Sequence, residues 1–143
     1  MAIAKLGRSK VNQPMHYSVG AIIKRGNKYL LIDRNIRPFG YACIAGHVDK
    51  GESAIRALIR EVKEESGLKV VKHKMLCKEE LDWNWCSRGI KVHYWCLFNC
   101  KVAGRVNQNF VETKNIGWYA PAQIKKLLLE PVWAYWFKKL KIL

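Results

Sequence analysis

The feature that most constrains this chain is an amphipathic segment at residues 53–66. Its apolar side chains follow the i, i+3, i+4, i+7 spacing of one face of an α-helix, and Gly67 comes next as a stop signal. The spacing predicts a helix over 53–66, with Ile55, Ile59 and Val62 anchoring it to a core. The four apolar positions are Ile55, Leu58, Ile59 and Val62.

Three glutamates lie on the flank of this predicted helix. Glu61, Glu64 and Glu65 are neighbours on its surface because residues three and four apart share a side. The chain has 26 Lys and Arg against 11 Asp and Glu, a net charge of +15, yet five of the acids fall within residues 49–65. Carboxylates held so close repel one another, and a hard divalent cation such as Mg²⁺ relieves that repulsion. The alternative is a solvated acidic face, since Glu is a good helix former.

The rest of the sequence predicts both strands and helices. A length of 143 residues suits one domain, and the class is α+β. Gly26 and Asn27 suit a hairpin turn between the first two strands. An aromatic stripe from Val132 to Leu140 is expected to pack on the domain. Strands are predicted over 17–24, 28–33, 41–44, 69–80, 90–100 and 116–119, and helices over 122–130 and 131–140, or one helix broken at Pro131.

Several classes of protein are disfavoured by composition. No apolar run approaches the roughly 18 to 20 residues of a membrane helix, and basic residues interrupt the start, so no secretory signal is predicted and a cytoplasmic location is expected. The five cysteines are odd in number and lack C-x-x-C spacing, which favours reduced thiols. A zinc site at Cys96 and Cys100 is disfavoured, because four residues of strand span about 13 Å.

The residues around the predicted helix form a longer motif. Gly46 is followed after five residues by Glu52, and after seven more by the run 60–68, R-E-V-K-E-E-S-G-L. This resembles the Nudix hydrolase signature, G-x5-E-x7-R-E-U-x-E-E-x-G-U with U aliphatic, at every specified position. The resemblance implies an α/β/α sandwich with a mixed sheet, a loop-helix-loop motif at 46–68 and a single Nudix domain over 1–143.

The resemblance also implies roles for the motif residues. It implies a Mg²⁺ site, with Mn²⁺ as a substitute, whose ligands are the Gly46 carbonyl and the carboxylates of Glu61, Glu64 and Glu65. Arg60 and Glu52 correspond to the pair that orients the catalytic helix by a salt bridge. For the general base, Glu61 is the first candidate. Glu112, six residues before Trp118, is the second, and an ordinary loop glutamate is its alternative.

The motif departs from the family in its entry loop. Ala45-Gly46-His47 stands where many members have Pro-Gly-Gly. His47 is expected to be a surface loop histidine or, alternatively, a phosphate contact.

Substrate-binding candidates lie outside the motif. Trp83 and Trp85 are candidates for stacking on a base, the alternative being that they pack under the sheet edge. Arg34 and Arg37 are candidates for phosphate contacts. Asn84 and Asn99 are further candidates for reading a base edge, and Lys24 and Lys91 for steering phosphates.

The expected substrate is a nucleotide. The family markers of ADP-ribose and NADH hydrolases are missing, which favours a nucleoside triphosphate, oxidised or otherwise non-standard ones included, cut to monophosphate and pyrophosphate. Alternatives are an ADP-ribose or dinucleoside polyphosphate hydrolase, an RNA 5′-end or cap hydrolase, and a non-catalytic nucleotide- or RNA-binding domain. The net charge of +15 makes RNA conceivable without favouring it. No membrane partner is expected, and a monomer and a homodimer are both compatible with the sequence.

Overall fold

The protein is described by a computed structural model that covers residues 2–107 and 113–143. Its centre is the long strand β2 (Pro14–Arg25), whose residues 15–23 pair in parallel with β7 (Val92–Ala103). β2 also pairs antiparallel with β3 (Lys28–Arg34), across the predicted hairpin turn. The sheet is therefore mixed, as predicted.

The other strands extend this centre on several sides. β1 (Leu6–Arg8) and β5 (Ile44–His47) each pair antiparallel with β2. β4 (Gly40–Ala42) and β8 (Thr113–Tyr119) flank β3. β6 (Lys69–Leu81) pairs along β7. The predicted strand over 41–44 is thus two short strands that join different neighbours.

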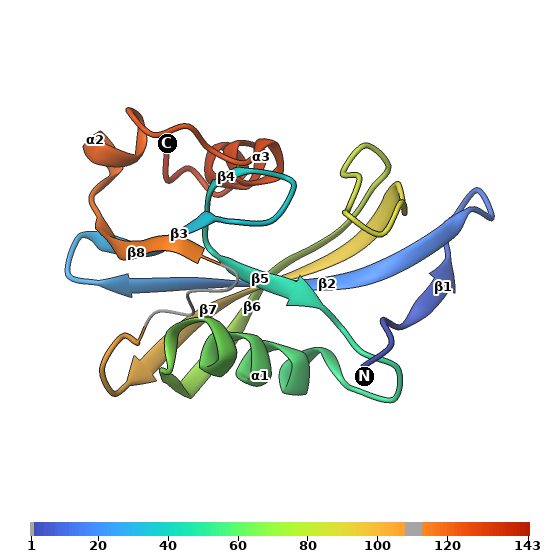
Figure 1. The fold of residues 1–143 in the computed structure, drawn as a ribbon, viewed down its shortest axis with the longest axis horizontal. Coiled ribbons are helices and arrows are strands. Elements are labelled where there is room, and N and C mark those ends of the chain that lie inside the picture. The colour runs from blue at the N-terminus through green and yellow to red at the C-terminus, as the bar shows by residue number, and fades with distance from the viewer. Residues whose placement is uncertain (1, 108–112) are drawn as a thin grey trace.

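Helices cover both sides of the sheet. Figure 1 shows α1 (Ala54–Ser66) on one side, and α2 (Pro121–Ile124) and α3 (Pro131–Lys139) on the other. The Ser53 hydroxyl caps α1 by accepting from the Arg56 N–H at 3.1 Å, and Gly67 ends the helix in a left-handed conformation at φ 75°. This layering confirms the predicted α/β/α sandwich.

The prediction that Ile59 anchors α1 is wrong. Ile59 is 42% exposed, whereas Ala57, Leu58 and Val62 are almost fully buried. The buried side of α1 also includes Glu61 and Glu65. The helix is therefore rotated from the orientation that its large apolar residues predict, because one acidic edge turns inward toward β5.

The predicted helix over 122–130 is also wrong beyond Ile124. The backbone of 128–130 instead pairs with β4: the Tyr41 N–H donates to the Leu128 carbonyl at 2.8 Å, and the Glu130 N–H donates to the Tyr41 carbonyl at 2.9 Å. Pro131 also disfavours a helical conformation at Glu130. Tertiary pairing therefore overrides a helical sequence pattern here.

The aromatic stripe of α3 packs into the core as predicted. Val132, Trp133, Trp136 and Phe137 are buried, and Trp95 of β7 meets both tryptophan rings edge-on. Residues on both faces of β7 are buried, as expected for a strand covered on two sides. In the described residues, no helix is long and apolar enough to cross a membrane.

Candidate active site

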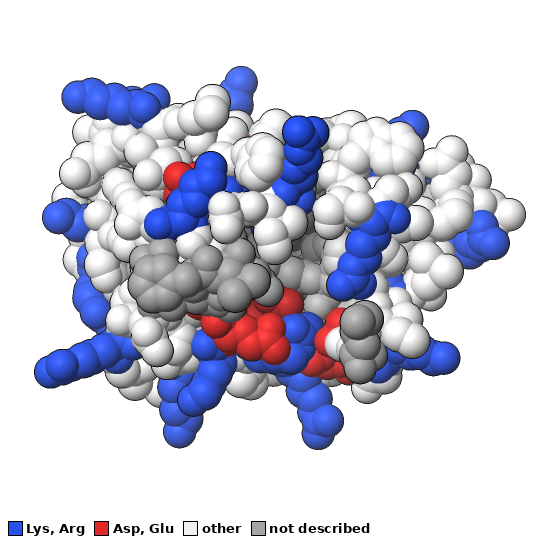
Figure 2. All heavy atoms as spheres, in the orientation of Figure 1, with Lys and Arg blue, Asp and Glu red and all other residues white. Residues whose placement is uncertain are grey.

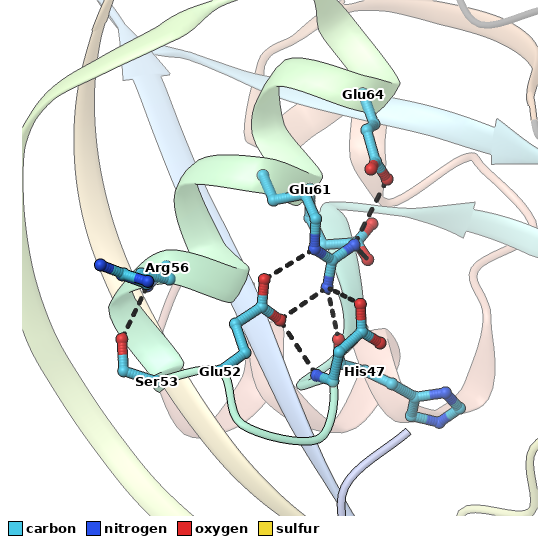
Figure 3. A network of polar contacts seen from close by, with 8 residues as sticks. His47, Glu52, Ser53, Arg56, Glu61 and Glu64 are labelled. Carbon is cyan, nitrogen blue, oxygen red and sulfur yellow. Dashed lines mark hydrogen bonds and ion pairs between the residues drawn. The ribbon is translucent and has the colours of Figure 1, made fainter. Parts of the chain in front are cut away.

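Arg60 is the hub of a polar network beside α1. Its Nε lies 2.9 Å from Oε2 of Glu52, and its Nη2 donates to Oε1 of Glu52 at 3.0 Å. Nη1 donates to Glu61 at 2.7 Å and to Glu64 at 3.3 Å. Nη2 also donates to the His47 carbonyl at 2.9 Å, and Figure 3 shows these groups converging beside the helix. One guanidinium thus joins β5, the following loop and α1.

The loop after β5 is tied to the same network. The Asp49 N–H donates to Oε1 of Glu52 at 3.0 Å, and the Asp49 carboxylate lies 3.4 Å from Arg60. The hydrogen bond from Arg60 is the largest of the effects that lower the pKa of Glu52, so that carboxyl is ionised at neutral pH. The salt bridge expected between Arg60 and Glu52 is present.

The carboxylates gather where a glycine leaves room for them. A Cβ at position 46 would collide with the Glu61 carboxylate. Glu61 and Glu65 are buried, at 9% and 3% exposure, while Glu64 opens to solvent. In Figure 2 most of the visible acidic side chains gather in the region of α1, among Lys and Arg. A cradle of hard carboxylate oxygens fits Mg²⁺ or Mn²⁺.

A cavity of about 410 Å³ opens beside these carboxylates. Its wall combines cationic, aromatic and polar side chains from β2, β3, β5, α1, β7 and the loops between them. It includes Arg34, Arg37, Trp85, Arg88, Trp95 and Glu130 as well as Gly46, Glu61, Glu64 and Glu65. The charged and aromatic lining suits a ligand with both phosphates and a ring.

The predicted substrate residues separate into two groups. Arg34, Arg37 and Trp85 line the cavity. Trp83 is not among the described residues that line it, and its ring meets Tyr135 at 5.6 Å. Glu112 lies outside the described residues.

Two polar residues of the cavity have contacts that the sequence did not predict. Glu130 is buried at 4% exposure, and burial raises its pKa to about 7 against the opposing charge of Arg34, which lies 3.6 Å away. Asn84, considered for base reading, accepts a hydrogen bond from the Trp95 indole at 3.0 Å. Glu130 precedes a helical proline, and nothing in that local pattern distinguishes it from an exposed helix cap.

The prediction of a surface loop histidine at position 47 is wrong. His47 ends β5, and its ring stacks on His93 at 5.4 Å and meets His16 at 4.7 Å. Burial is the main cause that lowers the pKa of His47 to about 3 and that of His93 to about 4. The three rings come from distant parts of the sequence, so only strand pairing reveals them as a cluster.

Comparison with known proteins identifies the family. A sequence model of the NUDIX domain matches residues 14–140, nearly the whole chain. The chain belongs to the Nudix family. Membership confirms the resemblance carried by residues 46–68, and it supports the prediction of an enzyme that hydrolyses phosphoanhydrides.

Individual relatives match this Nudix chain either over a short stretch or at low sequence identity. An ADP-ribose pyrophosphatase of Methanocaldococcus jannaschii is 45% identical over 53 residues, which are 36% of this chain and 31% of that protein. The match thus spans about a third of the curated relative.

Two solved Nudix structures share the fold. A MutT Nudix hydrolase from Burkholderia pseudomallei has a TM-score of 0.68 and 24% identity, covering 78% of this chain and 87% of that one. The Nudix domain of Shewanella oneidensis NrtR, complexed with ADP ribose, has a TM-score of 0.70 and 15% identity, covering 94% and 92%. At these identities the likeness concerns the fold alone.

Proposed function

We propose that this Nudix chain hydrolyses a phosphoanhydride bond in a nucleoside diphosphate derivative and depends on Mg²⁺. The observation that carries the proposal is the position of Glu61, Glu64 and Glu65, which line a cavity whose wall also includes Arg34, Arg37 and Arg88. Carboxylates suit the cation, and arginines suit the phosphates.

The motif residues would divide the work between holding the cation and holding the helix. Glu61, Glu64, Glu65 and the Gly46 carbonyl would be the ligands. When bound, the cation neutralises phosphate charge and lowers the pKa of water. Arg60 and Glu52 fix α1 against the loop through two parallel hydrogen bonds, so that the carboxylates stay in place.

Proton removal from the attacking water is assigned to Glu61. Its carboxylate is buried next to Gly46 and accepts a 2.7 Å hydrogen bond from Arg60, which orients it toward the cavity. Glu112 remains the second candidate.

The leading substrate is a nucleoside triphosphate, cut to a monophosphate and pyrophosphate. Arg34, Arg37 and Arg88 supply positive charge along the cavity, which suits a chain of phosphates. Trp85 presents an exposed indole at the cavity for stacking on the base.

ADP-ribose is the second candidate substrate. Two comparisons favour it: the curated relative is an ADP-ribose pyrophosphatase, and the Nudix domain of NrtR was solved with ADP ribose. The diphosphate of ADP-ribose would need the same carboxylates as a triphosphate. It would need fewer arginines, because it has fewer phosphates.

The test is a substrate panel with Mg²⁺, containing nucleoside triphosphates, ADP-ribose, dinucleoside polyphosphates and capped RNA, with products identified. Release of monophosphate and pyrophosphate supports the leading substrate. Glu61→Gln should reduce turnover by roughly 10²- to 10⁴-fold, whereas Glu80→Gln on β6, away from the cavity, should not. Inactivity across the panel, with Glu61→Gln identical to wild type, would overturn the proposal.

A salt series separates the RNA alternatives from the leading one. If long RNA competes with the mononucleotide and the competition falls steeply with salt, the basic surface binds nucleic acid. Competition that is absent at low salt argues against an RNA substrate.

A further inference from the structure

Three histidines and one cysteine converge at one wall of the cavity, and His47, Cys86 and His93 line it. They are His16, His47, Cys86 and His93, and one potential ligand atom from each lies within 4.8 Å of all the others. His16 and His93 are buried, and His47 and Cys86 are half-buried. We refer to these four residues as the His–Cys cluster.

The sheet holds three members of the His–Cys cluster in fixed positions. His16 of β2 is directly paired with His93 of β7. His47 of β5 is paired with Ser18, two residues further along β2 and thus on the same face of the sheet as His16. Three imidazoles on three adjacent strands form a rigid group that requires no movement to assemble.

Cys86 approaches from the loop between β6 and β7. Its N–H donates to the Ile90 carbonyl at 3.1 Å, and its carbonyl accepts from the Gly89 N–H at 3.0 Å. These bonds close a tight turn, and its Sγ lies 3.8 Å from Nδ1 of His16. The turn therefore presents the thiol to the histidines.

Two of the separations between ligand atoms are close to those of a tetrahedral coordination shell, and all of them lie within 4.8 Å. With Zn–N bonds of about 2.0–2.1 Å and a Zn–S bond of about 2.3 Å, adjacent nitrogens would lie about 3.4 Å apart, and a nitrogen and the sulfur about 3.6 Å apart. The Nε2 atoms of His47 and His93 are 3.4 Å apart, close to the first value. The 3.8 Å between Cys86 and His16 is close to the second.

The donor set is chemically different from that of the Mg²⁺ site. Imidazole nitrogen and thiolate sulfur favour Zn²⁺ over Mg²⁺, which takes oxygen ligands. Gly46 and His47 are consecutive in β5, so their side-chain positions face opposite sides of the sheet. The positive charge of Arg88 acts on His47 and would repel a metal ion there. The negative charge of a Cys86 thiolate would offset this repulsion.

We propose that the His–Cys cluster binds one Zn²⁺ ion, with His16, His47, His93 and Cys86 as its four ligands. The ion would fasten the loop that carries Cys86 to strands β2, β5 and β7, and so fix one wall of the cavity. This proposal does not depend on the proposed hydrolase activity, because that activity assigns no role to the side chains of the four residues.

The test uses the full chain, stripped with a chelator and titrated with Co²⁺ as a spectroscopic substitute for Zn²⁺. The expected result is one equivalent with strong visible bands of tetrahedral cobalt and a thiolate-to-cobalt charge-transfer band. Zn²⁺ should abolish both, while excess Mg²⁺ should not. A spectrum without the thiolate band would overturn the proposal.

Variants assign the ligands. Cys86→Ser should lose the charge-transfer band, and His16→Ala should weaken Co²⁺ binding at least about 10-fold. Cys77→Ser, a half-buried cysteine on β6 outside the cluster, and Glu64→Gln should each retain the band. Retention of the band in Cys86→Ser would overturn the assignment.

A measurement on the wild-type chain makes the test independent of variant folding. Native mass spectrometry of the zinc-loaded chain in excess Mg²⁺ should show one retained zinc ion. Failure to retain zinc there would also overturn the proposal.

Discussion

Arg60 and Glu52, eight residues apart, are joined by two hydrogen bonds of 2.9 and 3.0 Å between the guanidinium and the carboxylate. The two side chains are only partly exposed, at 26% and 16%. This pairing fixes the end of the loop before α1 to the helix itself. It therefore holds the carboxylates of α1 in a fixed position relative to β5.

Replacing Arg60 by Lys tests this relationship. Lysine keeps the charge but cannot form two parallel hydrogen bonds. We expect kcat to fall on the order of 100-fold, since misplacement of catalytic groups by about 1 Å has such an effect. The unfolding free energy should fall by about 1–3 kcal/mol. Arg56→Lys, an exposed residue of the same helix, is the control in both urea denaturation and kinetics. Equal losses in the two variants would contradict the role of the pair.

Gly46→Ala tests the cradle for the Glu61 carboxylate. The added Cβ would collide with that carboxylate, so the side chain has to move. We expect turnover to fall on the order of 100-fold, with a higher Mg²⁺ concentration needed for half-maximal rate. The matched control is Gly117→Ala in β8, where the nearest atoms of Tyr119 lie at an ordinary 3.4 to 3.6 Å. The idea fails if both variants show wild-type magnesium dependence.

Trp85 and Trp83 allow a paired test of base stacking. Trp85 lines the cavity and is 57% exposed, whereas Trp83 contacts Tyr135. Stacking on a base contributes about 1–3 kcal/mol, so Trp85→Ala should raise KM by roughly 5- to 100-fold. Trp83→Ala should leave KM close to wild type. Steady-state kinetics on the best substrate of the panel measures both KM values. A larger rise in KM for Trp83→Ala than for Trp85→Ala would contradict the stacking role of Trp85.

Glu130 should make stability depend on pH. Burial raises its pKa from the ordinary 4.5 to about 7 in the folded chain. Between these values the folded chain keeps a proton that the unfolded chain releases, so the contribution of this carboxyl to stability declines as pH rises from 4.5 to 7. Glu130→Gln removes that dependence.

The measurement is urea denaturation of both proteins below and above that pH window. The unfolding free energy of Glu130→Gln relative to wild type should rise across the window by up to about 3 kcal/mol. A difference that stays constant with pH would rule out a protonated Glu130 in the folded chain.

The sequence alone determined the family, the reaction class it supports and the helix of the motif. Spacing along one helix is local information, so Arg60, Glu61, Glu64 and Glu65 could be placed beside one another before any fold was known. The cap at Ser53 and the stop at Gly67 are equally local. The aliphatic and aromatic residues of 17–24 and the alternating pattern of 90–100 likewise predicted strands.

Only the tertiary structure decided which side of α1 is buried, where 128–130 pair and which residues meet across the sheet. Ile59 is exposed and Glu61 is buried because β5, not the apolar pattern of the helix, sets the rotation of α1. His16, His47 and His93 lie up to 77 residues apart in the chain and meet through strand register, as positions 16 and 93 show. Such contacts depend on pairing between distant segments, which no single stretch of sequence encodes.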